Sequence, residues 1–359
     1  MKKILVLSDS FTGYGAEYMI GWVGSMLAEN GYEVIFCSPF DSDKDDRLSD
    51  KGKFIGFGLR RNANPLLKII QYFLLSAWKV CKICKKHNID TIVTFKENPL
   101  CIALLAKLFK GVRHLHSERD DPYNRDTISS RFKMWLYRFC DKLVFQTVGA
   151  RDFFPENVRL RSSVIPNPVV VPEEQWRLDK SKKIIVCVGR LNVRYKRQDL
   201  LINAFSKFIE HHPDWLLMFV GDGKDMNHLK KLAKDLGVDK QVIFEGKVNN
   251  VKDYLLQSRI YVLSSDTEGM PNALMEAMAL GMPVITTDCS PGGGRYLVNN
   301  LVNGILVSKG NMEEIYEALM KISSMGDDVM KMACQARLDM TKLNPSIVSS
   351  QWINLINEL

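Results

Sequence analysis

Short apolar runs alternate with longer stretches of helical spacing from one end of the chain to the other. The strand candidates in the first half are 3–8, 33–38, 53–58, 91–95, 113–117 and 143–147, and those in the second half are 183–188, 216–220, 241–244, 260–264, 284–287 and 304–307. Strands separated by helices are typical of parallel sheets that helices cover on both faces. The pattern therefore predicts an α/β protein with two Rossmann-like, doubly wound domains.

A proline-rich segment separates the two sets of strands. Residues 164–172 contain three prolines, which make a stiff and extended connector. We therefore expect an N-terminal domain over 1–168 and a second domain over 169–340. The last segment, 341–359, has the pattern of an amphipathic helix that contains Trp352.

The net charge of +8 is unevenly distributed along the chain. Residues 60–161 carry 20 Lys and Arg against 9 Asp and Glu, which is more than the whole excess. A basic surface suits an anionic membrane or a nucleic acid. Within this window, 65–86 and 131–138 combine cations with aromatic residues, which suits lipid headgroups or, equally, a buried helix with a basic solvent edge. No uncharged apolar run approaches the roughly 18 residues of a membrane-spanning helix.

The eight cysteines are scattered, and only Cys81 and Cys84 form a CxxC pair. No second Cys or His pair follows at zinc spacing, so we interpret both as buried or half-buried helix positions. The chain begins with a strand-like run instead of a signal peptide. We therefore expect a reducing cytosol and free thiols.

The most informative stretch is 264–281, which follows a predicted strand. Gly269 and Pro271 are expected to form a tight turn. Asn272 suits the N-cap of a helix that ends at Gly281. The free amides at such a helix start form a seat for a pyrophosphate.

Two acids flank this helix start. Glu268 lies in the loop before it, and Glu276 lies one turn inside the helix. A carboxylate is a poor ligand for phosphate but a good acceptor for vicinal hydroxyls, as on a ribose or a hexose. The alternative is a pair of solvated glutamates beside a helix cap.

A second candidate loop follows the first strand of the second domain. Gly189 allows the backbone to turn close to a ligand, and Arg190 and Lys196 can stabilise a leaving diphosphate. Arg194 and Arg197 fit solvated positions better. Three weaker glycine-containing strand exits are Gly221, which suits a structural turn equally well, the segment before Val248, and Gly13 with Gly15, which open a helix.

With these residues in place, the chain resembles the retaining glycosyltransferases of family 4, which have the GT-B fold. The resemblance implies that Glu268 contacts the donor sugar, Glu276 the ribose, and Arg190 with Lys196 the diphosphate. The donor-binding candidates are Gly13, Gly15, Gly189, Gly221, Val248, Gly269, Met270, Pro271, Asn272, Ala273, Leu274 and Glu276.

The resemblance has one departure. Many members carry a His after a strand of the first domain, near the reacting sugar. Arg119 occupies that position here, and His116 is earlier and within the predicted strand. We favour Arg119 as the residue beside the sugar, with His116 as the alternative.

The resemblance also implies the reaction. A hexose or N-acetylhexosamine would move with retention, without a metal or another cofactor, from a nucleotide-sugar donor of UDP type to a sugar acceptor, lipid-linked as in bacterial surface polysaccharide synthesis. The acceptor would meet the first domain at the cytoplasmic face of the inner membrane, and the last helix would cross back to that domain. We interpret the acids Asp41, Asp43, Asp45 and Asp46 as a solvated loop, since they form no aromatic-flanked DxD metal motif.

Two alternatives stay open at this stage. A GT-B sugar-nucleotide epimerase would need an acid/base pair for proton abstraction, which the sequence does not suggest. A non-catalytic nucleotide-binding or nucleic-acid-binding protein would explain the basic window, but no nucleic-acid-binding module is recognisable, so we expect no nucleic acid partner.

Overall fold

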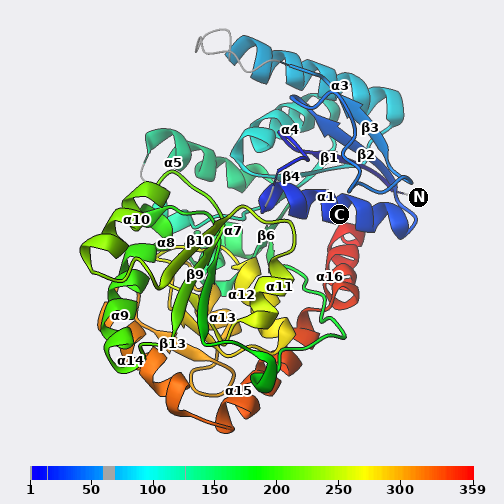
Figure 1. Cartoon of the computed structure of the whole chain (residues 1–359). Helices are drawn as coiled ribbons and strands as arrows, with labels where there is room; N and C mark the ends of the chain where they lie inside the picture. The colour runs from blue at the N-terminus through cyan, green and yellow to red at the C-terminus, as the bar shows by residue number, and fades with distance from the viewer. Residues whose placement is uncertain (1, 14, 60–68, 126) are drawn as a thin grey trace. The chain divides into compact units, whose positions relative to one another are not determined.

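The computed structural model describes residues 2–13, 15–59, 69–125 and 127–359 (Figure 1). Residues 65–68 of the helical pattern predicted over 65–86 lie outside this part. The chain forms two compact units, Met1–Pro166 with Val348–Leu359, and Asn167–Ile347. Both are built on a parallel sheet, which confirms the predicted α/β class.

The first unit holds a seven-stranded sheet in the order β3-β2-β1-β4-β5-β6-β7. Its strands are β1 (Lys3–Leu7), β2 (Glu33–Ser38), β3 (Lys53–Gly56), β4 (Thr91–Phe95), β5 (Arg113–Ser117), β6 (Lys142–Phe145) and β7 (Ser162–Val164). Its helices are α1 (Ala16–Glu29), the π-helix η1 (Ile69–Leu75), α3 (Ser76–His87), α4 (Glu97–Lys110), η2 (Pro122–Asn124), α5 (Ile128–Trp135), η3 (Leu136–Phe139), α6 (Val148–Asp152) and α7 (Glu156–Arg159).

The second unit holds a six-stranded sheet in the order β10-β9-β8-β11-β12-β13. Its strands are β8 (Ile184–Val188), β9 (Leu216–Val220), β10 (Val242–Gly246), β11 (Ile260–Leu263), β12 (Val284–Thr287) and β13 (Ile305–Val307). Its helices are η4 (Leu178–Lys180), α8 (Val193–Lys196), α9 (Gln198–His211), α10 (Met226–Asp235), α11 (Val251–Gln257), α12 (Asn272–Leu280), α13 (Gly293–Leu297), α14 (Met312–Ser324), α15 (Asp328–Met340) and η5 (Thr341–Leu343).

Every strand predicted from the apolar pattern is present, and the described residues contain one further strand that was not predicted. The missed strand, β7, has only three residues, Ser-Ser-Val, and all three are half-buried. A short polar edge strand leaves no alternating or continuous apolar signal. The structure places Cys81 and Cys84 in α3, half-buried and buried respectively, as predicted.

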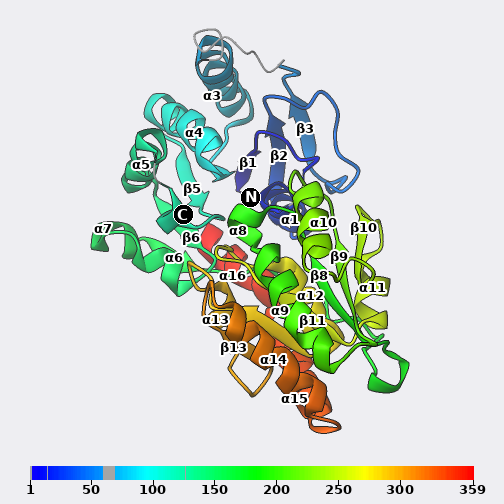
Figure 2. The same cartoon turned by 60° about the vertical axis from the view of Figure 1, so that its left-hand side comes forward.

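Helices cover both faces of the first sheet. On one face α1 buries Met19, Val23 and Leu27 at helical spacing against the sheet, and α16 (Pro345–Asn357) adds Trp352 to the same core. On the other face α3 and α4 pack over Leu5, Leu7 and Ile92. Figure 2 shows α3, α4 and α5 side by side along that flank.

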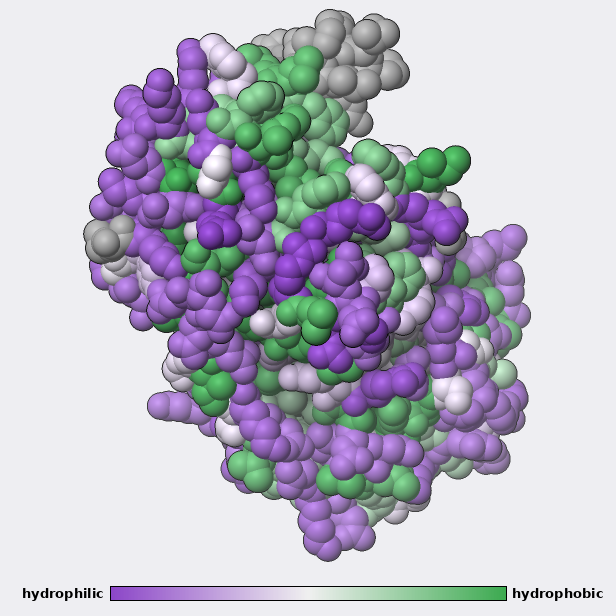
Figure 3. Space-filling model, turned by 180° about the vertical axis from the view of Figure 1, so that it is seen from behind, coloured by the Kyte–Doolittle hydropathy of each residue, from purple (hydrophilic) through white to green (hydrophobic). Residues whose placement is uncertain are grey.

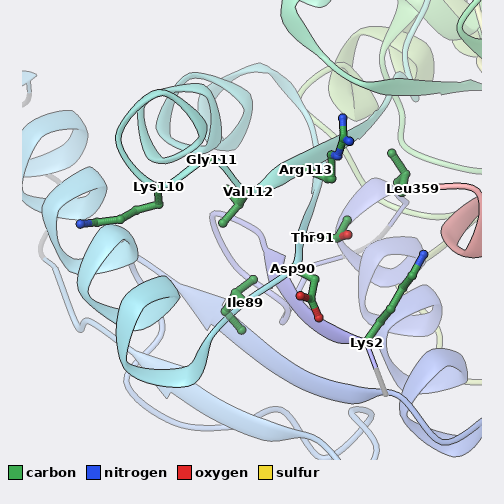
Figure 4. Close-up of a pocket in the computed structure, with 9 residues that line it drawn as sticks. All are labelled: Lys2, Ile89, Asp90, Thr91, Lys110, Gly111, Val112, Arg113 and Leu359. Carbon is green, nitrogen blue, oxygen red and sulfur yellow. The ribbon is translucent and has the colours of Figure 1, made fainter.

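The end of the chain is fixed within the first unit. Trp352 is fully buried and stacks on Phe95, with 5.9 Å between the ring centroids. Lys2 Nζ donates to the carbonyls of Ile356 and Asn357 at 2.8 and 3.0 Å, which satisfies free carbonyls at the end of α16. Lys2 and Leu359 border one pocket of about 400 Å³ at the amino edge of the sheet (Figure 4).

The strand order of each sheet defines one topological switch point, where the chain reverses its direction across the sheet. It lies between β1 and β4 in the first unit and between β8 and β11 in the second. Doubly wound sheets bind ligands beyond the carboxyl ends of the strands at this point. The loops that follow these four strands are therefore the places to look for a site. Among the described residues, no helix has the length and apolar character needed to cross a membrane.

Candidate functional site

An acid and a lysine meet at the switch point of the second unit. Lys196 ends α8, just after β8, and its Nζ donates to Oε1 of Glu268, which follows β11. Ser265 Oγ donates to the same carboxylate oxygen at 2.8 Å. Both side chains keep some access to solvent, 27% for Lys196 and 13% for Glu268. The structure thus brings together two of the predicted catalytic residues.

Backbone hydrogen bonds hold the two loops against each other. The amide of Asp266 donates to the carbonyl of Tyr195 at 2.8 Å, and Ser264 Oγ donates to the carbonyl of Lys196 at 2.9 Å. The amide of Glu268 donates to the carbonyl of Ser290 at 2.8 Å. The acid and the lysine are therefore positioned by fixed backbone rather than by mobile loops.

The glycines of this edge have different roles. Gly189 has a φ of +150°, and a Cβ there would meet nothing within 4 Å, so its surface is open to a ligand. Gly221 has a φ of +136°, and a Cβ there would lie 2.1 Å from the carbonyl oxygen of Gly189. Gly221 is therefore required for close packing of two strand exits, which is the structural alternative weighed for it.

The arginines of this loop differ in their surroundings: two are exposed, and one forms ion pairs. Arg190 is exposed, and its carbonyl accepts from Nε2 of Gln198 at 2.9 Å, which fixes its backbone. Arg197 instead pairs with Asp199 and Asp266. Arg194 is exposed and lies over the ring of Tyr195.

The start of α12 differs from the prediction in one detail. Asn272 is the first residue of the helix, not its N-cap, and no side-chain capping bond forms there. Its Oδ1 accepts from Nδ2 of Asn167 at 2.6 Å, so the side chain is directed to another segment. The first intrahelical bond is made by the amide of Met275 to the carbonyl of Pro271, which leaves the amides of 272–274 ahead of it.

The remaining candidates for binding the nucleotide sugar expose mainly backbone groups to a ligand. Met270 and Leu274 are buried, so only their main chains are available to a ligand. Gly269 and Ala273 are half-buried, and Val248 lies half-buried after β10. Glu276 lies one turn into α12 and is accessible, yet desolvation by the surrounding protein raises the pKa of its carboxyl.

The glycine loop of the first unit is fixed by the segment predicted as a solvated acidic loop. Asp41 accepts from Ser10 Oγ and from the amide of Phe11, both at 2.8 Å. Arg47, paired with Asp45, donates to the carbonyls of Phe11 and Gly13 at 2.7 and 3.3 Å. The solvated interpretation is therefore wrong for Asp41, which reaches the neighbouring β1 exit itself, and for Asp45, which pairs with the arginine that reaches it.

Gly13 and Gly15 serve this loop in different ways. A Cβ on Gly13 would overlap the carboxylate of Glu17, which folds back over it. Gly15 precedes α1 with a φ of +63°, a conformation that favours glycine.

Both candidates for the position beside the sugar are buried in the first unit. Arg119 is 7% exposed, with its guanidinium 4.4 Å from the ring of Phe95 and 5.5 Å from that of Trp352. Desolvation lowers the pKa of Arg119 to about 9, so it stays charged at neutral pH. His116 lies within β5, as predicted, and its Nδ1 is 2.9 Å from Thr94 Oγ1; burial lowers its pKa well below the usual value.

The structure also shows a cluster of polar residues in the first unit that the sequence did not predict. Asp9 follows β1, Lys96 follows β4, and both lie at the switch point of the first unit. Tyr72 donates to Asp9, and Lys96 Nζ donates to Glu17 at 2.6 Å. The available signal was the place of both residues directly after predicted strands, but neither belongs to a motif.

Two family models match the chain, one described as glycosyl transferases group 1 over residues 172–339 and one as glycosyltransferase family 4 over residues 15–171. The N-acetyl-alpha-D-glucosaminyl L-malate synthase of Bacillus anthracis is 32% identical and aligns over 79% of both chains. The chain belongs to glycosyltransferase family 4. The predicted enzyme class is thereby confirmed.

Two further glycosyltransferases are similar to this chain in sequence. An uncharacterized glycosyltransferase of Haemophilus influenzae is 27% identical over 99% of this chain and 100% of its own length. The Escherichia coli UDP-Gal:alpha-D-GlcNAc-diphosphoundecaprenol alpha-1,3-galactosyltransferase is 25% identical over 67% of this chain and 68% of its own.

Solved structures support the GT-B fold of this glycosyltransferase. The lipopolysaccharide outer core galactosyltransferase WaaB superimposes with a TM-score of 0.81 at 18% identity, covering 100% of this chain and 99% of its own. Anabaena HepE, in complex with UDP and glucose, gives a TM-score of 0.82 at 18% identity and covers 100% of both chains.

Proposed function

We propose that this glycosyltransferase moves a hexose or N-acetylhexosamine, with retention, from a UDP-sugar to a lipid-linked sugar in the synthesis of a bacterial surface polysaccharide. The observation that carries the proposal is the meeting of Lys196 and Glu268 at the switch point of the second unit. The E. coli relative, a UDP-Gal:alpha-D-GlcNAc-diphosphoundecaprenol alpha-1,3-galactosyltransferase, supports the proposed classes of donor and acceptor.

The donor site follows from the chemistry of these residues. Lys196 and the exposed Arg190 offer positive charge to the diphosphate, and the amides that begin α12 add hydrogen-bond donors. Glu268 accepts from hydroxyls of the donor sugar, and Glu276 accepts from those of the ribose. One site thereby holds the sugar, the diphosphate and the ribose.

Transfer needs no enzyme nucleophile in this proposal. The acceptor hydroxyl attacks C1 of the donor sugar on the face from which the diphosphate departs, so the new C1–O bond keeps the original configuration. The bond from C1 to the diphosphate oxygen breaks, and a phosphate oxygen of UDP takes the hydroxyl proton. Lys196 and Arg190 stabilise the negative charge that develops on the leaving UDP.

The proposal places the acceptor lipid at an anionic bilayer, through a basic-aromatic face formed by α3, α4, α5 and η3. Exposed apolar side chains on it are Trp78, Leu108, Phe109, Phe132, Trp135 and Phe139. Exposed or partly exposed cations among them are Lys82, Lys85, Lys86, Lys110, Arg131 and Arg138. Hydrophobic side chains are also exposed on the first unit, near the top of Figure 3.

The charge of this face matches an anionic surface. Residues 76–87 and 127–140 contain no acidic residue. Lys82 lies 3.6 Å from the ring centroid of Trp78, and Arg138 lies 4.5 Å from that of Trp135. Aromatic rings beside cations are typical of proteins that rest in the headgroup region of a bilayer.

Replacing both Phe132 and Trp135 with Ala is expected to weaken binding to vesicles by about tenfold, because two large apolar anchors are lost. Flotation with vesicles of phosphatidylglycerol and phosphatidylcholine measures this. Leu338→Ala, at a site 59% exposed in the second unit, is the control and should bind as the unchanged chain does. Equal binding to pure phosphatidylcholine, or no effect of the double change, would contradict the membrane contact.

Lowering the pH is expected to weaken UDP binding through Glu276. The ribose hydroxyls need an ionised acceptor, and desolvation raises the pKa of this carboxyl above its ordinary 4.5. Affinity is therefore complete above the raised pKa and is lost as the pH falls through it. Calorimetric titration with UDP between about pH 7.5 and 5 measures the change. The phosphate of UDP also titrates in this range, so Glu276→Gln should bind more weakly and keep only that smaller pH dependence; identical pH curves would contradict the role.

The proposed function is tested by product analysis. Thermal-shift screening against a panel of nucleotide sugars selects the donor, because a ligand that binds the folded state raises the melting temperature. The selected donor is then incubated, in EDTA, with alpha-D-GlcNAc-diphosphoundecaprenol and a panel of related lipid-linked sugars. The expected product keeps the anomeric configuration of the donor, as read by NMR. An inverted linkage would refute retention, and an epimerised sugar nucleotide formed without acceptor would favour the epimerase instead.

A further inference from the structure

The switch point of the first unit has the geometry of a binding site. β1 and β4 pair in parallel, with Leu7 opposite Thr94, and the chain leaves them toward opposite sides of the sheet. Asp9 lies two residues after β1, and Lys96 directly follows β4. Ligands of doubly wound sheets bind beyond such strand ends. The two residues therefore flank the position where this sheet is expected to hold a ligand.

Polar side chains from four different segments converge there. Tyr72, from η1, donates to Oδ1 of Asp9, and Asn98, from α4, lies near the same carboxylate. Lys96 Nζ donates to Oε1 of Glu17, from α1, at 2.6 Å. Glu17 and Lys96 remain partly accessible, with exposed side-chain fractions of 20% and 36%. The cluster is thus organised by the protein and open to solvent.

The backbone at Lys96 is held in an unfavourable conformation. Its φ of +64° and ψ of 162° belong to a region that is almost restricted to glycine. Such a residue persists only where the surrounding structure imposes it, and it is found most often at functional sites. The ion pair with Glu17 is one contact that directs the Lys96 side chain into the cluster.

Both units pair a lysine with a carboxylate at the switch point, but the two residues come from opposite strand exits in the two sheets. In the second unit, Lys196 after β8 pairs with Glu268 after β11, at the switch point where the donor sugar is proposed to bind. In the first unit a lysine after β4 pairs with the acid that folds over the loop after β1. Each sheet thus presents a lysine and a carboxylate at its switch point.

The charges of the first-unit cluster define the ligand class. Two carboxylates, Asp9 and Glu17, surround one ammonium, so the cluster repels a phosphate. Among the described residues, no group of three or more His, Cys, Asp or Glu side chains is arranged to hold a metal ion. Carboxylate acceptors beside ammonium, phenol and amide donors suit a neutral ligand with several adjacent hydroxyls.

We propose that Asp9, Glu17 and Lys96 bind the hydroxyl groups of the acceptor sugar. Tyr72 and Asn98 position the Asp9 carboxylate. Burial raises the pKa of Asp9 above its ordinary value, although the hydrogen bond from Tyr72 and the charge of Lys96 oppose that rise. This inference rests on the proposed sugar transfer, but it concerns the acceptor only.

Two variants separate acceptor binding from donor binding. Asp9→Asn keeps the shape of the side chain and removes its charge. Lys96→Gly removes the side chain while glycine adopts the positive φ without strain. The KM for the lipid-linked sugar that the unchanged chain glycosylates is expected to rise at least about tenfold in both, as the loss of a charged hydrogen bond allows. The Kd for UDP and the slow hydrolysis of UDP-sugar without acceptor should stay within about twofold. Asp46→Asn, at an exposed acid of the same unit, should change neither.

Acceptor KM values within twofold of the unchanged chain in both variants would overturn the acceptor site and leave the proposed function intact. A parallel loss of UDP affinity in both would also overturn it, because the cluster would then support the fold or the donor. An unchanged chain that neither binds nor uses any sugar nucleotide would instead refute the proposed function.

Discussion

Replacing Lys196 with Ala is expected to lower kcat for sugar transfer by about 100- to 1000-fold, the usual effect of removing a charge-stabilising donor from a transition state. The loss has two parts. The leaving diphosphate loses a cation, and Glu268 loses the partner that now directs its carboxylate. Lys196→Arg keeps the charge and should recover part of the rate.

The loop that carries Lys196 offers a matched control. Arg194 lies in the same short helix, α8, but is exposed and stacked on Tyr195. Arg194→Ala should therefore change kcat by no more than about threefold. Steady-state rates of UDP release, measured in parallel for the two variants, test this difference in kcat. Equal losses in both would show that α8 matters only as a folded element.

Replacing Trp352 with Ala is expected to destabilise the first unit by about 3–5 kcal/mol, as for other large buried aromatic residues. The indole is fully buried against Phe95 and lies below the guanidinium of Arg119. Its removal leaves a cavity and takes away one of the two rings that Arg119 contacts. The shift of the urea unfolding curve measures the loss.

The measured loss of stability must be assigned to one of the two units, because multidomain proteins need not unfold in a single transition. Hydrogen exchange of peptides from β1 and β4 supplies it. Ile347→Ala changes an apolar residue of the same helix that is 45% exposed, and it should cost less than about 1 kcal/mol. An equal effect of both changes would mean that Trp352 is not part of the first core.

The sequence predicted the sheets because parallel strands buried on both faces leave continuous apolar runs, such as 4–7 and 184–188. It missed β7, whose polar edge position leaves no such run. The helix end at Gly281 was also predicted correctly, since the φ of +77° there requires a residue that tolerates the left-handed region. Local chemistry decides features of this kind.

Features that depend on contacts between distant segments could not be predicted from the sequence. Asn272 has the composition of an N-cap, but its side chain bonds to Asn167, far away in the chain. Asp41 looks solvated until the neighbouring β1 exit is seen to supply Ser10 and Phe11 as donors. The cluster around Asp9 and Lys96 arises only when β1 and β4 lie side by side. Long-range pairing of this kind leaves no local motif.

Motifs, by contrast, were informative in the second unit. The loops after β8 and β11 are short and begin at predicted strands, so Lys196 and Glu268 could be expected at one sheet edge. For Arg119 the motif gives a place in the sequence, whereas the structure shows a guanidinium buried against the rings of Phe95 and Trp352. The position of a residue after a strand does not fix the direction of its side chain.

We propose that the switch point of the second unit transfers a sugar from UDP to an acceptor. The most direct measurement counts UDP released and glycosylated lipid formed, with the donor and acceptor selected above, for the unchanged chain and Lys196→Ala in parallel. We predict one UDP for each product in the unchanged chain, and at least a hundredfold slower formation of both in the variant. Full activity of Lys196→Ala, or binding of UDP-sugar by the unchanged chain without any product, would contradict the account.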